Sequence, residues 1–204
     1  MAYSDFSLAK VKKDFELVEQ TGHLFQQVGT LEASPWLKET FAVSIPLALS
    51  SSSEKARSEF IVAPILLEIE KRNPGEFAIF SGERLDVDEE KGLKGECDFI
   101  LSKGPISSNV QAPILLLVEA KKNDIKEGLG QCIAQMIGAQ LFNRKENNQI
   151  EEIHGCVTTG EAWQFLKLTG KTILISAPRY YLGELQQVLW LFQHIVDIYK
   201  TKPG

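Results

Sequence analysis

The sequence predicts an α/β (α+β) protein with a small mixed sheet of about four or five strands flanked by helices. Up to residue 72, apolar residues recur every three or four positions, which favours helices. From Phe77 the apolar pattern changes period, and the unbroken apolar run over 113–120 is typical of a central strand buried on both faces. Helices and strands do not alternate as in a doubly wound sheet, and the strands are not evenly spaced as in a sandwich.

Composition sets the broad class. The 204 residues suit one domain, or one domain with an extension, and 44% hydrophobic residues can form a real core. The net charge of −5 counts against a nucleic-acid binder, because phosphate binding relies on Lys and Arg. Three isolated cysteines favour buried thiols in a reducing compartment. No apolar run has the length of a signal peptide core or a membrane span. We expect a soluble cytoplasmic protein.

The first 53 residues are expected to form an N-terminal helical extension, followed by a domain over 54–204. Within 5–20, Leu8, Val11, Phe15 and Val18 share one helix face. A second helix is expected to begin at Ser34-Pro35, where serine can cap and proline fits the first turn.

The domain is expected to open with a helix over 53–72 that Ser53 caps. Pro64 inside this segment predicts a kink or a late start. Extended segments are then expected over 77–87, 96–102, 113–120, 153–158, 160–168 and 171–175, with helices over 126–143 and 183–199.

One group of polar residues is a candidate catalytic site. Asp98 lies on a predicted strand, and Glu119-Ala120-Lys121 ends the next one. Residues two apart on a strand face the same side, so Glu119 and Lys121 project together. Two carboxylates suit a hard cation such as Mg²⁺, which stabilises phosphate charge and activates water. A lysine beside that water can stabilise developing negative charge.

A lone acid-x-Lys triplet is a weak signal, and Asp124-Ile125-Lys126 is a second one in this chain. The plain alternative for Glu119 and Lys121 is a strand end that reaches solvent. Context favours a site, because the triplet ends a buried apolar strand, where charges are costly unless paired or metal-bound.

These residues resemble the PD-(D/E)xK nuclease superfamily, which has the restriction-endonuclease-like fold and carries an Asp on one strand and Glu-x-Lys on the next. The following Gly128-x-x-Gln131-x-x-x-Gln135 is similar to the GxxQxxxY helix of the RecB-like branch. Two positions depart from the family pattern. Gln135 stands where that helix has tyrosine, and Cys97 stands where the superfamily has proline.

Two further stretches resemble the nuclease part of type I restriction subunits, and small stand-alone cyanobacterial proteins have a similar look. Glu54-x-x-Arg57 looks like the first helix of that part, and the segment over 157–165 resembles its late hairpin. The resemblance covers about residues 54–176. It implies an acid from the first helix, either Glu54 or Glu59, of which Glu59 is favoured as nearer the helix middle.

The resemblance implies Mg²⁺-dependent hydrolysis of DNA, with Mn²⁺ as an alternative metal. The implied catalytic residues are Asp98, Glu119, Lys121, Gln131 and Glu59, of which Asp98 and Glu119 hold the metal. Glu96 could add a ligand and Lys122 a phosphate contact, although surface charges explain both. A homodimer through the N-terminal or final helix is a further expectation. The alternative function is a non-catalytic module that binds nucleic acid or protein on a nuclease-like fold.

Overall fold

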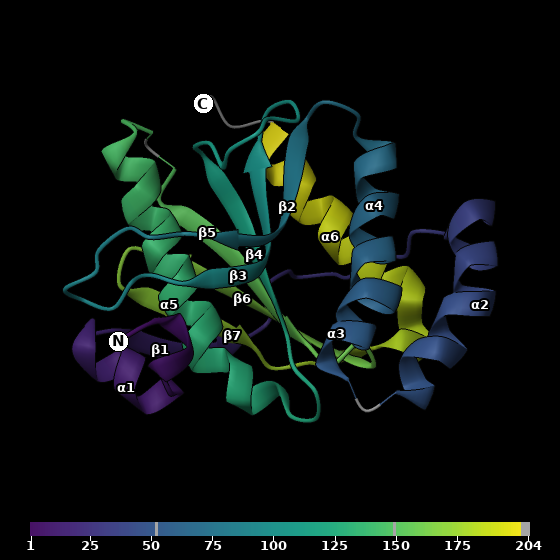
Figure 1. Cartoon of the computed structure of the whole chain (residues 1–204), viewed down its shortest axis with the longest axis horizontal. Coiled ribbons are helices and arrows are strands. Elements are labelled where there is room, and N and C mark those ends of the chain that lie inside the picture. Colours follow the sequence, from purple (N-terminus) through teal and green to yellow (C-terminus); the bar gives the residue numbers. More distant parts are fainter. Residues whose placement is uncertain (52, 149, 201–204) are drawn as a thin grey trace.

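A single mixed sheet of eight strands forms the centre of the protein (Figure 1). The computed structural model describes residues 1–51, 53–148 and 150–200; residue 52 of the expected extension, and residues 149 and 201–204 of the expected domain, lie outside them. Along the sheet the strands run in the order β1-β7-β6-β5-β4-β3-β2, and β8 pairs with β6. The strands are β1 (Val18–Gly22), β2 (Phe77–Arg84), β3 (Glu96–Lys103), β4 (Ile114–Ala120), β5 (Glu152–Thr158), β6 (Ala162–Thr169), β7 (Thr172–Ser176) and β8 (Tyr180–Tyr181).

Two antiparallel units meet at the middle of the sheet. The meander β2-β3-β4 is antiparallel throughout, and so is β5-β6-β7. They join through the parallel pair β4 and β5, where Ala120 lies opposite Thr158. A parallel pair needs a crossover connection, and the long helix α5 (Ile125–Lys145) provides it.

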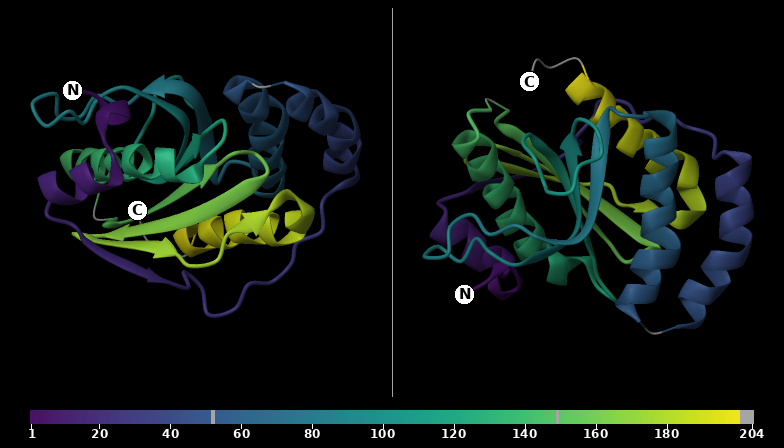
Figure 2. Two further views of the ribbon diagram at one scale, coloured as in Figure 1. Left: turned by 90° about the horizontal axis from the view of Figure 1, so that it is seen from below. Right: turned by 45° about the horizontal axis from the view of Figure 1, so that its top comes forward.

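Helices cover both faces of the sheet (Figure 2). On β5, Gly155 faces Met136 and Cys132 of α5, whereas the ring of His154 bonds to Tyr199 of α6 (Leu185–Lys200), so these helices lie on opposite faces. The short elements η1 (Tyr3–Asp5) and α1 (Leu8–Asp14) pack on α5. The second helical group comprises α2 (Pro35–Ser50), α3 (Glu54–Arg57), the π-helical turn η2 (Ser58–Val62) and α4 (Ala63–Arg72), and a 3-10 turn, η3 (Leu182–Glu184), precedes α6.

The expected sheet of four or five strands is wrong, because the sheet has eight. The late hairpin β6-β7 continues the same sheet, and β1 extends it by pairing in parallel with β7. The expected N-terminal helical extension also contributes a strand, β1, to the sheet. Val18 was assigned to a helix that in fact ends at Asp14, and it begins β1 with its backbone N–H bonded to the carbonyl of Lys171.

The helix starts follow local chemistry. Ser34 accepts the backbone N–H of Leu37 at the start of α2, and Ser53 accepts that of Ala56 at the start of α3, as their capping role predicts. Pro64 lacks an N–H donor, and the helical segment before it widens into the π turn η2 before α4 begins. Where a kink or a late start was expected at Pro64, the structure has this π turn, and α4 begins after it at Ala63.

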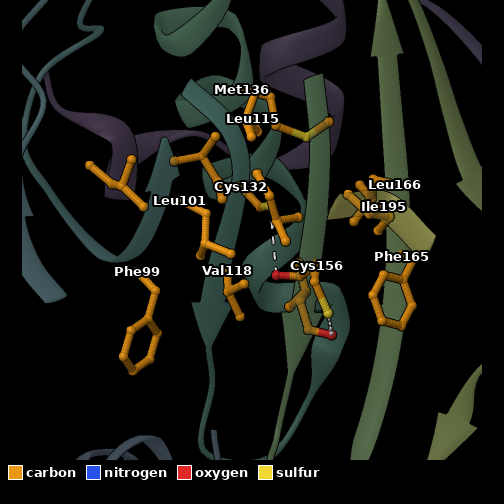
Figure 3. Close-up of a cluster of buried hydrophobic side chains, with 14 of the residues drawn as sticks. Phe99, Leu101, Leu115, Val118, Cys132, Met136, Cys156, Phe165, Leu166 and Ile195 are labelled. Atoms are coloured by element: carbon orange, nitrogen blue, oxygen red, sulfur yellow. Dashed lines mark hydrogen bonds between the residues drawn. The ribbon is translucent and has the colours of Figure 1, made fainter. Parts of the chain in front are cut away.

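The core fills both sides of the central strands. Figure 3 shows Leu115 of β4 near Met136 of α5. On the other face of the sheet, the ring of Phe165 of β6 lies 5.2 Å from that of Phe192 of α6. The three cysteines are buried free thiols. The Sγ of Cys132 donates to the carbonyl of Cys156, so α5 is tied to β5 (Figure 3). Within the described ranges, no helix is long and apolar enough to cross a membrane.

Candidate functional site

The ends of β3 and β4 bring the predicted acidic residues together. The register places Phe99 opposite Val118, which sets Asp98 beside the last residues of β4. Oδ2 of Asp98 accepts the backbone N–H of Ala120 at 2.7 Å. Asp98 and Glu119 therefore belong to one site, and this contact holds the Asp98 carboxylate against the end of the neighbouring strand.

Glu119 is the buried centre of this site. Its side chain is 1% exposed, and both carboxylate oxygens accept hydrogen bonds. Oε1 accepts the ammonium of Lys121 at 2.6 Å, and Oε2 accepts Nε2 of Gln135 at 2.8 Å. The first donor comes from just past the end of the same strand and the second from α5, so the carboxylate is held from two sides.

Helix α5 begins beside the site and approaches it closely. Asp124 caps the helix by accepting the backbone N–H of Lys126. A β-carbon at Gly128 would lie 2.6 Å from Cγ1 of Val157 and 2.9 Å from Cγ of Lys121. A glycine is thus needed in the first turn, because a larger residue would press on the lysine side chain.

A cavity of about 320 Å³ opens at the site. Four of the five predicted catalytic residues line it, namely Asp98, Glu119, Lys121 and Gln131, together with Glu54 and Glu96. Residues 2–4 of the N-terminal segment form another part of its wall. A second cavity of about 400 Å³ shares Glu54, Glu96 and Asp98 with the first, and Glu59 lies there.

The first-helix acid beside the predicted triad is Glu54 rather than the favoured Glu59. Glu59 lines only the second cavity, is exposed, and lies 3.7 Å from the ammonium of Lys55. Arg57 of the same helix donates to the carbonyl of Thr159 at 2.9 Å and pairs with Glu161 at 2.5 Å. These contacts attach α3 to the turn between β5 and β6 and fix where Glu54 lies.

Burial governs the electrostatics of the two carboxylates. It raises the pKa of Glu119 to about 7, and the charge of Asp98 adds to this effect, while Lys121 and Gln135 oppose it. Burial also raises the pKa of Asp98, although the N–H of Ala120 lowers it. For Lys121, burial lowers the pKa, but the carboxylate of Glu119 outweighs this and the net pKa is raised. Two carboxyl groups and one ammonium thus lie together at the wall of a cavity, and their pKa values are shifted by burial and by one another.

The donor set fits a hard divalent cation. No group of three or more His, Cys, Asp and Glu side chains is arranged to hold a metal in the described part of the chain. Magnesium sites commonly use only one or two carboxylates and complete the coordination shell with water and substrate phosphates. Asp98 and Glu119 supply these two carboxylates, and the mutual repulsion that raises the pKa of Glu119 is one that a bound cation would relieve.

Sequence reasoning missed two features of the site. Gln135 contacts Glu119 directly, and a signal existed because Gln131 and Gln135 are four residues apart and share a helix face. The wall formed by residues 2–4 carried no sequence signal, because it depends on Tyr3 packing against Gly138 of α5. Lys122 is exposed, and Glu96 lines both cavities.

The chain matches no protein-family model, and no curated protein is significantly similar to it.

Proposed function

We propose that the protein is a divalent-metal-dependent phosphodiesterase that acts on DNA, with the PD-(D/E)xK type of site. The observation that carries the proposal is the buried carboxylate of Glu119, which has the partly buried carboxylate of Asp98 beside it and the ammonium of Lys121 at 2.6 Å. A buried carboxylate next to a second one is costly for folding, and a cation ligated by both would offset that cost.

Each residue has a chemical task in this proposal. Asp98 and Glu119 would hold the cation, Mg²⁺ or Mn²⁺, which when bound polarises a phosphate and lowers the pKa of a coordinated water. Lys121 stays protonated, since its pKa is raised, and its ammonium stabilises negative charge at the phosphate. Gln131 lines the cavity with an uncharged amide that can bond to a phosphate oxygen or to water.

DNA is the proposed substrate class because the reaction requires a phosphodiester and two exposed lysines follow the site residues in the sequence. Lys122 and Lys126 follow β4, are exposed, and take part in no salt bridge within residues 1–51, 53–148 and 150–200. Such cations can neutralise phosphates on either side of the reacting one.

A second candidate function, a non-catalytic binding module, is favoured by the acidic surroundings of the site. Glu54, Glu59 and Glu96 line the second cavity, and the net charge of the chain is −5. These carboxylates repel a duplex backbone and favour a cationic or protein partner.

The homodimer remains a proposal. It was expected through α1 or α6, but Val11 of α1 and Phe192 of α6 are fully buried in the core of the chain itself. A dimer would have to use other surfaces of these helices or another element.

A cleavage assay separates the candidate functions. Purified full-length protein is incubated with linear, nicked, branched and single-stranded DNA, with matching RNA, and with Mg²⁺, Mn²⁺ or EDTA. The proposal predicts cleavage of at least one DNA form that EDTA and Lys121→Ala both abolish. DNA binding without cleavage in either metal would instead support the binding module.

A further inference from the structure

We propose that Gln135 is a positioning residue of this site, which holds Glu119 in the orientation that binds the cation. The inference rests on the proposed function and extends it to a residue that does not line the cavity. Gln135 acts only through Glu119, so its effect should be seen in metal affinity before anything else.

The contact geometry supports this role. Nε2 of Gln135 donates to Oε2 of Glu119 at 2.8 Å, while the ammonium of Lys121 occupies Oε1. A carboxylate oxygen has two lone pairs, so each oxygen keeps one acceptor position after these bonds. With a donor at each oxygen, rotation about the last side-chain bond is blocked, and the open lone pairs keep a fixed direction.

Burying the amide of Gln135 costs free energy, which indicates that the amide is needed for its hydrogen bond to Glu119. The Gln135 side chain is fully buried, and its Oε1 finds no hydrogen-bond partner within the described ranges. Leaving a buried acceptor unpaired costs free energy, whereas an apolar side chain of similar size would fill the same space without that loss. Among the described residues, the hydrogen bond to Glu119 is the contact of Gln135 that an apolar residue could not replace.

A second glutamine on the same helix provides a matched control. Gln140 is 5% exposed, and its Nε2 donates at 2.7 Å to the carbonyl of Glu151, just before β5. Both glutamines are buried in α5 and donate one hydrogen bond to an oxygen. They differ in the acceptor, which is a site carboxylate for Gln135 and a backbone carbonyl for Gln140.

The test measures Mn²⁺ affinity of the full chain by isothermal titration calorimetry for the wild type, Gln135→Met and Gln140→Met. Groups that orient metal ligands typically change affinity by about 10- to 100-fold when removed. We expect Gln135→Met to weaken Mn²⁺ binding by about that factor and Gln140→Met to leave it unchanged. Thermal unfolding without metal should show a decrease for both variants, because each loses one buried hydrogen bond, so the metal affinity and not the stability separates them.

The other possible results overturn the positioning role of Gln135, the proposed function, or both. Equal affinity of the wild type and Gln135→Met would overturn the positioning role and leave the proposed function standing. Equal weakening by both variants would assign the effect to helix packing and overturn it as well. Absence of Mn²⁺ binding by the wild type would remove the proposed function and the positioning role together. If Gln135→Met does not fold, by circular dichroism, the smaller Gln135→Leu replaces it under the same criteria.

Discussion

Two buried glutamates, Glu68 and Glu119, are each 1% exposed, yet their surroundings push their pKa values in opposite directions. Burial alone would raise the pKa of Glu68, but the N–H and hydroxyl of Ser34 and the guanidinium of Arg72 all donate to it and bring its pKa below the usual value. Glu119 has two donors and a neighbouring carboxylate, and its pKa rises to about 7.

The difference separates a carboxylate that the protein itself stabilises from one that it leaves destabilised. Glu68 accepts four hydrogen bonds from Ser34 and Arg72, and it links the start of α2 to the end of α4. Glu119 keeps acceptor positions open beside a cavity and is destabilised by Asp98. Open acceptor positions at a destabilised buried carboxylate are what the proposed metal site requires.

The largest expected effect is on activity. Glu119→Gln should reduce metal-dependent DNA cleavage by about 10³-fold, because it removes a negative metal ligand at the centre of the site. Glu68→Gln should leave cleavage unchanged at temperatures where it is folded. Single-turnover assays measure the cleavage rate. A Glu119→Gln protein that cuts at the wild-type rate would contradict the distinction between Glu119 and Glu68.

Loss of the Glu68 carboxylate should destabilise the protein, whereas loss of the Asp98 charge should stabilise it. Glu68→Ala should lower the free energy of unfolding by about 2–3 kcal/mol, since it leaves Arg72 and the Ser34 N–H without their acceptor. Asp98→Asn keeps an oxygen for the Ala120 N–H and removes the charge that repels Glu119, so it should stabilise the metal-free protein by about 1 kcal/mol. Urea unfolding measures both, and destabilisation by Asp98→Asn would contradict the electrostatic reading of the site.

The two glutamates should also give opposite pH dependences of stability. The folded-state pKa of Glu119 is above its ordinary value of 4.5, so its contribution is present below pH 4.5 and is lost as pH rises to about 7. The pKa of Glu68 is below its ordinary value, so its contribution is present above pH 4.5 and is lost as pH falls through its folded pKa.

Urea unfolding between pH 4 and 8 without metal checks this dependence. The stability of the wild type relative to Glu119→Gln should fall between pH 4.5 and about 7 and then level off. A difference that grows with rising pH over this range would show that Glu119 is stabilised as an anion, which the account excludes.

The smallest effect is expected at Gly128. A β-carbon there would lie 2.9 Å from Cγ of Lys121, so Gly128→Ala should shift the lysine and reduce cleavage about 10-fold, as small displacements of catalytic groups do. Gly183→Ala is the matched control, because a β-carbon at Gly183 meets no atom within 4 Å. Equal activity of the two alanine variants would show that Lys121 does not need its present position.

Much of the fold could be predicted where local pattern decides structure. The strand bearing Asp98, the apolar strand ending in Glu119 and the helix with Gln131 lie within one to two residues of their expected bounds at each end. Strand β1 could not be found this way. Its sequence, VEQTG, is largely exposed and lacks an apolar alternation, and it is held by backbone bonds to β7 about 150 residues further on.

The site was predictable in part for similar reasons. The spacing of Glu119 and Lys121 predicts that their side chains lie on the same side, because residues two apart on one strand face the same way. The choice between Glu54 and Glu59 depends on how α3 is tied by Arg57 to a turn 102 residues away, and position along the helix does not reveal it. The contact between Gln135 and Glu119 likewise depends on how α5 packs on β4.

The most direct test of the central claim is anomalous diffraction from crystals grown with Mn²⁺. The account predicts an anomalous peak roughly 2.0–2.6 Å from carboxylate oxygens of both Asp98 and Glu119, the range of hard-cation oxygen ligands. Its absence from Asp98→Asn crystals would serve as the control. A fully occupied Mn²⁺ peak elsewhere, with none between Asp98 and Glu119, would contradict the account.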